Sequence, residues 1–287
     1  MEKVELDELK QHAKDLRKML LTMIYKAQSG HPGGSLSATD IVAALYFHAM
    51  NVDPKNPKWP DRDRFVLSKG HVCPVLYSAL IMRGFMEEKE VDTLRKQGSL
   101  LQGHPDMKRC PGIEISTGSL GQGFSCAVGM ALAGQRDEKD YMVYTLLGDG
   151  ECDEGQVWEA AQAANKYKLD NLCVIIDLNG LQIDGPTSEV MPTDPVDAKM
   201  RDFGFRTVTI DGHDFAQIED AFQYFHTQTG APTAVLMNTT KGKGVSYMEN
   251  QVGWHGKAPN DEEYAQAMTE LRAAHATLEK EIEFNNG

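Results

Sequence analysis

The chain has 287 residues, 41% of them hydrophobic and 25% charged, and these proportions are those of an ordinary globular protein with a core of normal size. Its formal net charge of −13 argues against a general binder of nucleic acid or of an anionic membrane surface, because both are themselves negatively charged. No run of about 18 consecutive apolar residues occurs, so we expect no membrane-spanning segment.

The first predicted element is an amphipathic helix. Apolar residues recur at intervals of three and four positions from Leu9 to Ala27, which places them on one helix face. The helix is predicted to end at Ser29 and Gly30, so that His31, within "SGHPGGS", lies in the loop beyond. A second helix is expected over about residues 38–50, and "RFVLS" is typical of a strand.

From residue 116 onward, predicted strands and helices alternate. A Gly-rich turn, "STGSLGQG", precedes a helix of small residues, and the apolar run "LCVIID" is typical of a strand buried on both faces. The alternation predicts an α/β fold with a doubly wound, mainly parallel sheet and helices on both faces, and we expect one domain over residues 1–287. The strands are predicted at 64–68, 141–147, 172–177, 206–210 and 233–237, and the later helices at 124–135, 154–167, 215–227 and about 260–283.

Two polar residues follow successive strands of this predicted sheet. Asp149 lies in "GDG" after the strand at 141–147, and Asn179 lies in "LNG" after the strand at 172–177. A right-handed crossover brings the carboxyl ends of such strands to the same sheet edge, where ligands bind in this fold class. A carboxylate, an amide oxygen and a backbone carbonyl suit Mg²⁺ or Ca²⁺, and Gly150 lets backbone N–H groups approach a phosphate. We therefore predict a metal–diphosphate site at this edge.

Each of the two motifs by itself is more often a simple turn, and it is their joint position after linked strands that favours a site. A nucleotide site is another interpretation of a Gly-rich phosphate loop. However, the patterns G-x-G-x-x-G and G-x-x-x-x-G-K-[ST] are both absent, and "KGKGVS" lacks the required spacing.

Histidine beside glycine is a second recurring feature. Glycine weakens helices and strands, so stability gives little reason for this pairing. An imidazole can both give and take a proton near neutral pH, which suits catalysis. Five of the nine histidines have a glycine neighbour, namely His31, His71, His104, His213 and His255.

Taken in order, these motifs resemble the transketolase family. "GDG" followed after 28 residues by Asn is similar to the thiamine diphosphate signature, and the matching blocks cover about residues 10–260. They are "SGHPGGSLS", "RDRFVLSKGH", "GHPD", "STGSLGQG", "GDGECDEGQVWEA", "LNGLQIDG" and "KGKGVSYMENQVGWHG". The resemblance implies the diphosphate-binding (PP) fold, thiamine diphosphate with Mg²⁺ as cofactors, and a transferase that moves a two-carbon ketol unit from a ketose to an aldose.

The resemblance also implies roles for individual residues. One local departure is Leu178, where the family usually has a second Asn, although the metal-matched Asn179 is retained. His213 is expected to be structural, because "IDGHD" has no cofactor match, and His12, His48, His226 and His275 are expected in helices. The implied metal ligands are Asp149, Asn179 and the carbonyl of Leu181; the implied cofactor contacts are His71, Gly118, Leu120, Asp149, Gly150, Asn179, Ile183 and His255; the implied catalytic residues are His31, His71, His104, His255 and Glu154. His31 and His104 would hold sugar hydroxyls, and Glu154 would belong to a proton relay across a subunit interface.

Length is the larger departure from the family. A whole transketolase is more than twice as long, and the pyrimidine-binding domain with its activating glutamate and the carboxy-terminal domain are absent here. The resemblance therefore implies the N-terminal subunit of a split enzyme that acts on sugar phosphates, that is active only with a C-terminal partner chain, and that forms an α2β2 assembly. The ending "EFNNG" is expected to be either a natural terminus or a cut at a linker.

Two further interpretations stay open at this point. One is the α subunit of a 2-oxo acid dehydrogenase or another thiamine diphosphate enzyme, against which "SGHPGG", "SKGH" and "WHGKAPN" favour transketolase. The other is a non-catalytic cofactor-binding module, which the full set of histidines and metal ligands disfavours. The sugar is left open between pentose-phosphate-pathway sugars and an unusual branched or sulfonated ketose.

The cysteines and the amino terminus bear on the compartment. The five cysteines are scattered, without C-x-x-C spacing, so we expect reduced thiols and no zinc site. The amino terminus lacks the basic-then-apolar order of a signal peptide. Together these features predict a cytoplasmic protein.

Overall fold

The computed structural model describes residues 3–227 and 230–286, which include one five-stranded sheet whose strands are all parallel. The strand order is β1-β2-β3-β5-β4, so β1 and β4 form the two edges of the sheet and β5 lies between β3 and β4. The predicted parallel α/β sheet is confirmed, with each strand within about one or two residues of its predicted range. The strands are β1 (Arg64–Leu67), β2 (Val143–Gly148), β3 (Leu172–Leu178), β4 (Arg206–Asp211) and β5 (Thr233–Asn238).

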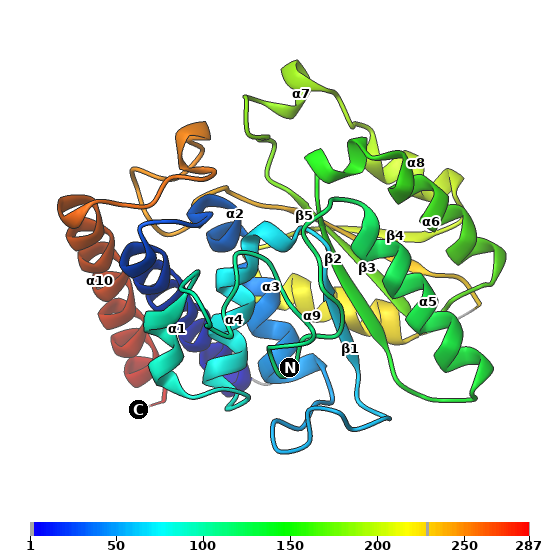
Figure 1. Ribbon diagram of the computed structural model, residues 1–287, viewed down its shortest axis with the longest axis horizontal. Coiled ribbons are helices and arrows are strands. Elements are labelled where there is room, and N and C mark those ends of the chain that lie inside the picture. The colour runs from blue at the N-terminus through cyan, green and yellow to red at the C-terminus, as the bar shows by residue number, and fades with distance from the viewer. Residues whose placement is uncertain (1–2, 228–229, 287) are drawn as a thin grey trace.

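Helices cover both faces of this sheet, as Figure 1 shows. One layer contains α1 (Lys3–Ala27), α2 (Pro32–Ser37), α3 (Thr39–Ala44), α4 (Cys73–Met82) and α9 (Phe215–His226). The other contains α5 (Gln122–Arg136), α6 (Gly155–Lys166) and α8 (Val196–Asp202). The short α7 (Thr187–Val190) lies in the connection after β3, and α10 (Asp261–Asn286) packs along α1.

The strand "LCVIID" divides its side chains between the two layers. Cys173 and Ile175 pack into the core formed with α1, α3, α4 and α9, whereas Val174 and Ile176 pack into the core formed with α5, α6 and α8. All four side chains are fully buried. A strand covered on both faces buries successive side chains in two cores, which explains the continuous apolar run from Leu172 to Ile176.

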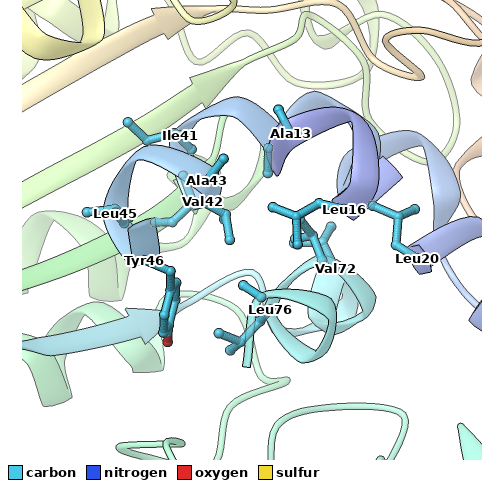
Figure 2. Close-up of a cluster of buried hydrophobic side chains, with 14 of the residues drawn as sticks. Ala13, Leu16, Leu20, Ile41, Val42, Ala43, Leu45, Tyr46, Val72 and Leu76 are labelled. Carbon is cyan, nitrogen blue, oxygen red and sulfur yellow. The ribbon is translucent and has the colours of Figure 1, made fainter. Parts of the chain in front are cut away.

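Figure 2 shows how the larger core is closed beside the sheet. Leu16 and Leu20 of α1 face Val42 of α3 and Leu76 of α4, and none of these side chains is more than 2% exposed. Burial of each such side chain is worth roughly 1.5–3 kcal/mol. This cluster holds α1 and α3 together beside the sheet and so fixes the position of the segment between them.

The segment "SGHPGGS" differs in part from its prediction. His31 lies between helices as expected, but Pro32 directly begins the short helix α2. Proline is well suited to a first helical position, where its missing N–H and fixed φ cost nothing. A Cβ at Gly33 would lie 2.9 Å from the carbonyl oxygen of Trp254, and one at Gly34 would lie 2.7 Å from Val72. The glycines therefore allow a helix to pass through a crowded site.

Other predicted helices are also confirmed with changed bounds. The helix expected over residues 38–50 is α3 followed by a π-helical turn over Leu45–Ala49, and the final helix α10 extends to Asn286. Helix α4 was not predicted, because its residues are apolar on every side and show no period. Within the described ranges, no helix is both long enough and apolar enough to cross a membrane.

Candidate active site

The site is built at the carboxyl ends of the strands, beginning with β2 and β3. These two strands are neighbours, with Gly148 opposite Asp177, so their following loops meet. Asp149 joins them: its carboxylate accepts hydrogen bonds from the backbone N–H of Gly150 at 2.8 Å and of Gly180 at 2.6 Å. The predicted meeting of the "GDG" and "LNG" segments is therefore present in the structure.

These loops line a pocket of about 250 Å³. A Cβ at Gly150 would lie only 2.8 Å from Gln182, so the bare backbone of Gly150 keeps the pocket open. Ile183 stands at its edge with 64% of its surface exposed. Of the candidate residues, the pocket is lined by His71, Leu120, Asp149, Gly150, Asn179, Leu181, Ile183 and His255.

Two buried lysines form cationic walls of this pocket, and neither was among the candidate residues. Lys69 follows β1 and pairs with Asp177, and both side chains are almost completely buried. Lys241 follows β5, is 2% exposed, and donates to the carbonyl oxygen of Leu181 and to Nδ1 of His255, both at 2.9 Å. The rule that site residues follow strand ends, applied to lysine as well as to aspartate, would have found both.

Asp177 and Glu151 are further buried acids that the sequence analysis missed. Asp177 is fully buried and also accepts from the hydroxyls of Ser37 and Thr239, so it ties α2 to the ends of β3 and β5. Burial by itself raises the pKa of Asp177, but Lys69, together with the hydroxyls of Ser37 and Thr239, outweighs burial and holds this pKa below its ordinary value. Glu151 accepts from Ser68 and from two backbone N–H groups. These acids hold the pocket loops together.

Three histidines meet at the mouth of the pocket. The ring centroid of His71 lies 5.1 Å from that of His31 and 5.3 Å from that of His255, and the His31 and His255 centroids are 5.5 Å apart. Burial, followed by nearby cations, lowers the pKa of His31 and of His255 to about 4 and that of His71 well below its ordinary value. All three imidazoles are therefore neutral at pH 7, a state in which each ring offers one donor and one acceptor.

His104 lies beside this triplet, on the far side of Gly118. A Cβ at Gly118 would be 3.0 Å from the His104 ring, and the His104 backbone carbonyl accepts from the Tyr77 hydroxyl at 3.0 Å. Burial and then the Arg95 guanidinium lower the pKa of His104, and the same guanidinium contributes to lowering the pKa of His31. Arg95 donates to the Ser29 hydroxyl at 2.7 Å and so stands at the rim.

The comparisons with known proteins identify the family. Residues 9–281 match the model described as transketolase, thiamine diphosphate binding domain. This chain belongs to the transketolase family. The match decides against the α subunit of a 2-oxo acid dehydrogenase and confirms the resemblance on which the residue roles were based.

Relatives of two lengths are found. The chain is 47% identical to the 6-deoxy-6-sulfo-D-fructose transketolase subunit SqwG of Clostridium sp. (strain MSTE9), over 92% of this chain and 96% of that protein. It is 44% identical to a subunit of the apulose-4-phosphate transketolase of Phocaeicola vulgatus, over 99% of this chain and 100% of that one. Human transketolase is 42% identical over 88% of this chain, but the match spans only 40% of the human protein.

Solved transketolases have the same fold. The crystal structure of transketolase from Campylobacter jejuni superposes with a TM-score of 0.88 at 32% identity, covering 97% of this chain and 46% of that one. The chain therefore corresponds to the thiamine diphosphate-binding part of the longer transketolases and spans less than half of their length.

The pocket residues fit the cofactor that the family implies. Asp149 is 5% exposed, and burial followed by the charge of Asp177 raises the pKa of its carboxyl to about 6. The N–H groups of Gly150 and Gly180 and the charge of Lys69 offset this shift only in part, so a bound cation would stabilise the carboxylate. The carbonyl of Leu181 already faces one cation, the Lys241 ammonium. Asn179 supplies an amide oxygen beside them. This oxygen set suits a hard divalent cation, and the two lysines suit a diphosphate.

The remaining candidates lie outside the pocket. Glu154 is exposed at the start of α6, and a Cβ at Gly121 would lie 3.1 Å from it. His213 is hydrogen-bonded to Asp40 and to the backbone of Thr240. His12, His48 and His226 lie in helical segments as predicted, and the side chain of His275 is outside the part that the structure describes.

Proposed function

We propose that this chain is the N-terminal, cofactor-binding subunit of a two-chain transketolase, which transfers a two-carbon ketol unit from a ketose to an aldose with Mg²⁺ and thiamine diphosphate. The observation that carries the proposal is the pocket itself: three neutral histidines within 5.5 Å of one another above a buried Asp149 and two buried lysines. The relatives that match over nearly their whole length are named as subunits, which supports the two-chain form.

We further propose that residues 1–287 form a single PP domain and that a separate partner chain supplies the pyrimidine-binding and carboxy-terminal domains. Several large apolar side chains near the pocket support such a partner, because Ile183 and Met191 are more than half exposed and Val190 is 38% exposed. Glu154 lies exposed beside the pocket loops, in keeping with a proton relay across that interface. An α2β2 assembly in the cytoplasm is the state we propose for the complete enzyme.

The metal is proposed to be Mg²⁺, for which Ca²⁺ could substitute, with Asp149, Asn179 and the carbonyl of Leu181 as its protein ligands. Three protein oxygens leave coordination positions for diphosphate oxygens and water. Gly150, Gly118, Leu120 and Ile183 would contact the cofactor. When bound, thiamine diphosphate supplies the carbanion chemistry that ketol transfer needs.

The protein side chains would position the sugar and move its protons. His31 and His104 are proposed to hold sugar hydroxyls, and His71 and His255 to lie nearest the diphosphate and the reacting carbon. Nδ1 of His31 is buried and has no hydrogen-bond partner among the described residues. An unsatisfied buried nitrogen costs free energy unless a ligand bonds to it, so this atom is proposed to bind substrate.

The substrate is proposed to be a ketose with an anionic end. The names of relatives point to apulose 4-phosphate and to 6-deoxy-6-sulfo-D-fructose, and pentose phosphates are the third possibility. We propose that the partner chain is encoded in a neighbouring reading frame, and the two chains should be mixed and assayed against a panel of all three donors. Ketol transfer that needs both chains supports the proposal, and full activity of this chain alone contradicts it.

Substitution of the histidines separates an enzyme from a cofactor-binding module. His31→Asn and His104→Asn should reduce turnover in the two-chain enzyme at least tenfold without preventing assembly. His48→Gln is the matched control, because His48 pairs with Glu219 and neither side chain lines the pocket. If His31→Asn and His104→Asn leave turnover at the level of His48→Gln, the catalytic assignment of these histidines is wrong.

A further inference from the structure

His213 occupies a buried hydrogen-bond network behind the pocket. Its Nε2 lies 2.9 Å from the backbone nitrogen of Thr240, and its Nδ1 lies 2.7 Å from Oδ2 of Asp40. A backbone N–H can only donate, so Nε2 must be the unprotonated acceptor. The proton therefore sits on Nδ1 and is donated to Asp40, which fixes a neutral His213 in one tautomer.

Asp40 is itself held by Arg17. The guanidinium of Arg17 makes two hydrogen bonds to the Asp40 carboxylate, and both side chains are less than 10% exposed. Burial by itself raises the pKa of the Asp40 carboxyl, but Arg17 and His213 together hold it below its ordinary value. A bidentate arginine–carboxylate pair fixes the orientation of the carboxylate. Because His213 donates to that carboxylate, the orientation of its ring is fixed as well.

The network makes hydrogen bonds to two backbone atoms of one short turn, residues 240–243. His213 accepts from the N–H of Thr240, and Nε of Arg17 donates to the carbonyl of Lys243 at 3.2 Å. Between these two points lies Lys241, whose side chain faces the pocket. The turn is also joined to α2 through the N–H of Gly242 and the carbonyl of Gly33, at 2.9 Å.

Lys241 needs such support because its ammonium is almost fully buried. Burial of a charge is costly unless its partners are placed accurately, and here the partners are the carbonyl of Leu181 and Nδ1 of His255. A small shift of the turn would separate the ammonium from both partners. The position of the backbone at residues 240–243 therefore determines whether the cationic wall of the pocket is formed.

We propose that His213 is a positioning residue of the cofactor pocket: oriented by Asp40 and Arg17, its neutral ring holds the turn at residues 240–243 so that Lys241 reaches Leu181 and His255. The significance for cofactor binding rests on the proposed function, whereas the effect on the turn does not. His213 lines no part of the pocket, in keeping with its predicted structural role, and acts on it only through the backbone.

The experiment compares His213→Ala and His213→Gln with His48→Gln as control. Amide hydrogen exchange in the full chain should accelerate at residues 239–244 in His213→Ala, by at least tenfold, while the amides of β2 stay protected. Lys241 should become more reactive toward acetic anhydride, as measured by mass spectrometry. His213→Gln keeps an acceptor near the Nε2 position, so the increases in exchange and in Lys241 reactivity should both be smaller than in His213→Ala. His48→Gln should show neither increase.

A second readout measures cofactor binding. In the two-chain complex, the affinity for thiamine diphosphate with Mg²⁺ should fall by roughly ten- to a hundredfold in His213→Ala. If wild type binds no thiamine diphosphate, the proposed function fails, yet exchange and acetylation still test the role of His213. Unchanged exchange at 239–244, or acceleration spread evenly over the sheet, overturns the proposal.

A third measurement needs no variant. Nitrogen-15 NMR of the imidazole in the wild-type chain should show His213 as the neutral tautomer protonated at Nδ1. A ring protonated at Nε2 cannot accept from Thr240 and overturns the proposal even if the variants do not fold.

Discussion

The ammonium of Lys241 lies 2.9 Å from Nδ1 of His255, so the neutral histidine acts as an acceptor for a buried cation. Burial and then the charge of Lys241 lower the pKa of His255 to about 4, and burial lowers the pKa of Lys241 to about 8. Since Lys241 also bonds to the carbonyl of Leu181, this one side chain joins the side of the pocket where we propose the metal to the histidines at the pocket mouth.

Lys241→Met should therefore have two effects. The pKa of His255 should rise, because its nearest cation is gone, and the affinity for thiamine diphosphate should fall about tenfold or more, which is about 1.4 kcal/mol. NMR titration measures the pKa of His255, and calorimetry measures the affinity for thiamine diphosphate. Lys139→Met, which removes a lysine paired with Asp61 on an exposed surface, is the control and should change neither. An unchanged pKa of His255 in Lys241→Met would show that the contact is not formed in solution.

Asp149→Asn should abolish the rise in melting temperature that Mg²⁺ with thiamine diphosphate gives. The pKa of Asp149 is raised to about 6, so the folded chain takes up a proton at higher pH than the unfolded chain. This carboxyl therefore lowers the stability of the metal-free chain as pH rises from about 4 to about 6. At pH 7 without metal, the asparagine variant should be at least as stable as wild type, whereas Mg²⁺ with thiamine diphosphate should raise the melting temperature of wild type only.

The matched control for this change is Asp184→Asn, because Asp184 is an exposed aspartate in the loop after β3. It should melt as wild type does, with and without the cofactors. A cofactor-induced rise in melting temperature that persists in Asp149→Asn would remove Asp149 from the metal site.

The histidines at the pocket mouth should make the stability of the folded chain depend on pH in the opposite direction to Asp149. The pKa values of His31 and His255 are about 4 in the folded chain, below the ordinary 6.5, so the unfolded chain binds more protons between these values. Stability is therefore lost as pH falls from about 6.5 to about 4. After allowance for screening by solvent, each histidine should account for roughly 1–2 kcal/mol. His31→Asn and His255→Asn should each flatten the wild-type curve from urea unfolding at several pH values, and an unflattened curve would mean that these rings are not desolvated.

A pair of glycine substitutions tests the packing of α2. Gly34→Ala places a Cβ 2.7 Å from Val72, the residue that follows His71, and overpacking of this kind costs about 1–3 kcal/mol. Gly129→Ala, in α5 with no atom within 4 Å of its Cβ, should instead stabilise the chain by about 0.5–1 kcal/mol. Denaturant unfolding of both variants measures the difference, and destabilisation of equal size at both positions would contradict the close approach at α2.

Much of the fold was predictable from periodicity. The apolar run at 172–177 became β3 with one residue added, and the stripe from Leu9 to Ala27 became α1. The loops after β2 and β3 were also predictable, because parallel strands joined by one crossover place their ends together. Helix α4 escaped prediction because it lacks periodicity. Helix α2 escaped it because a Pro-Gly-Gly segment has low intrinsic helix propensity and is helical here only because tertiary contacts enclose it.

The amino-acid sequence by itself determined which residues could do chemistry: the glycine-flanked histidines, Asp149 and Asn179, and with them the family. Only the tertiary structure decided which polar and charged side chains are paired at the pocket and around it. The pairing of Lys69 with Asp177 spans 108 positions and that of His213 with Asp40 spans 173. Neither pairing leaves a periodic trace along the chain, because such contacts arise only when segments far apart in the sequence are packed together and water is excluded from between them.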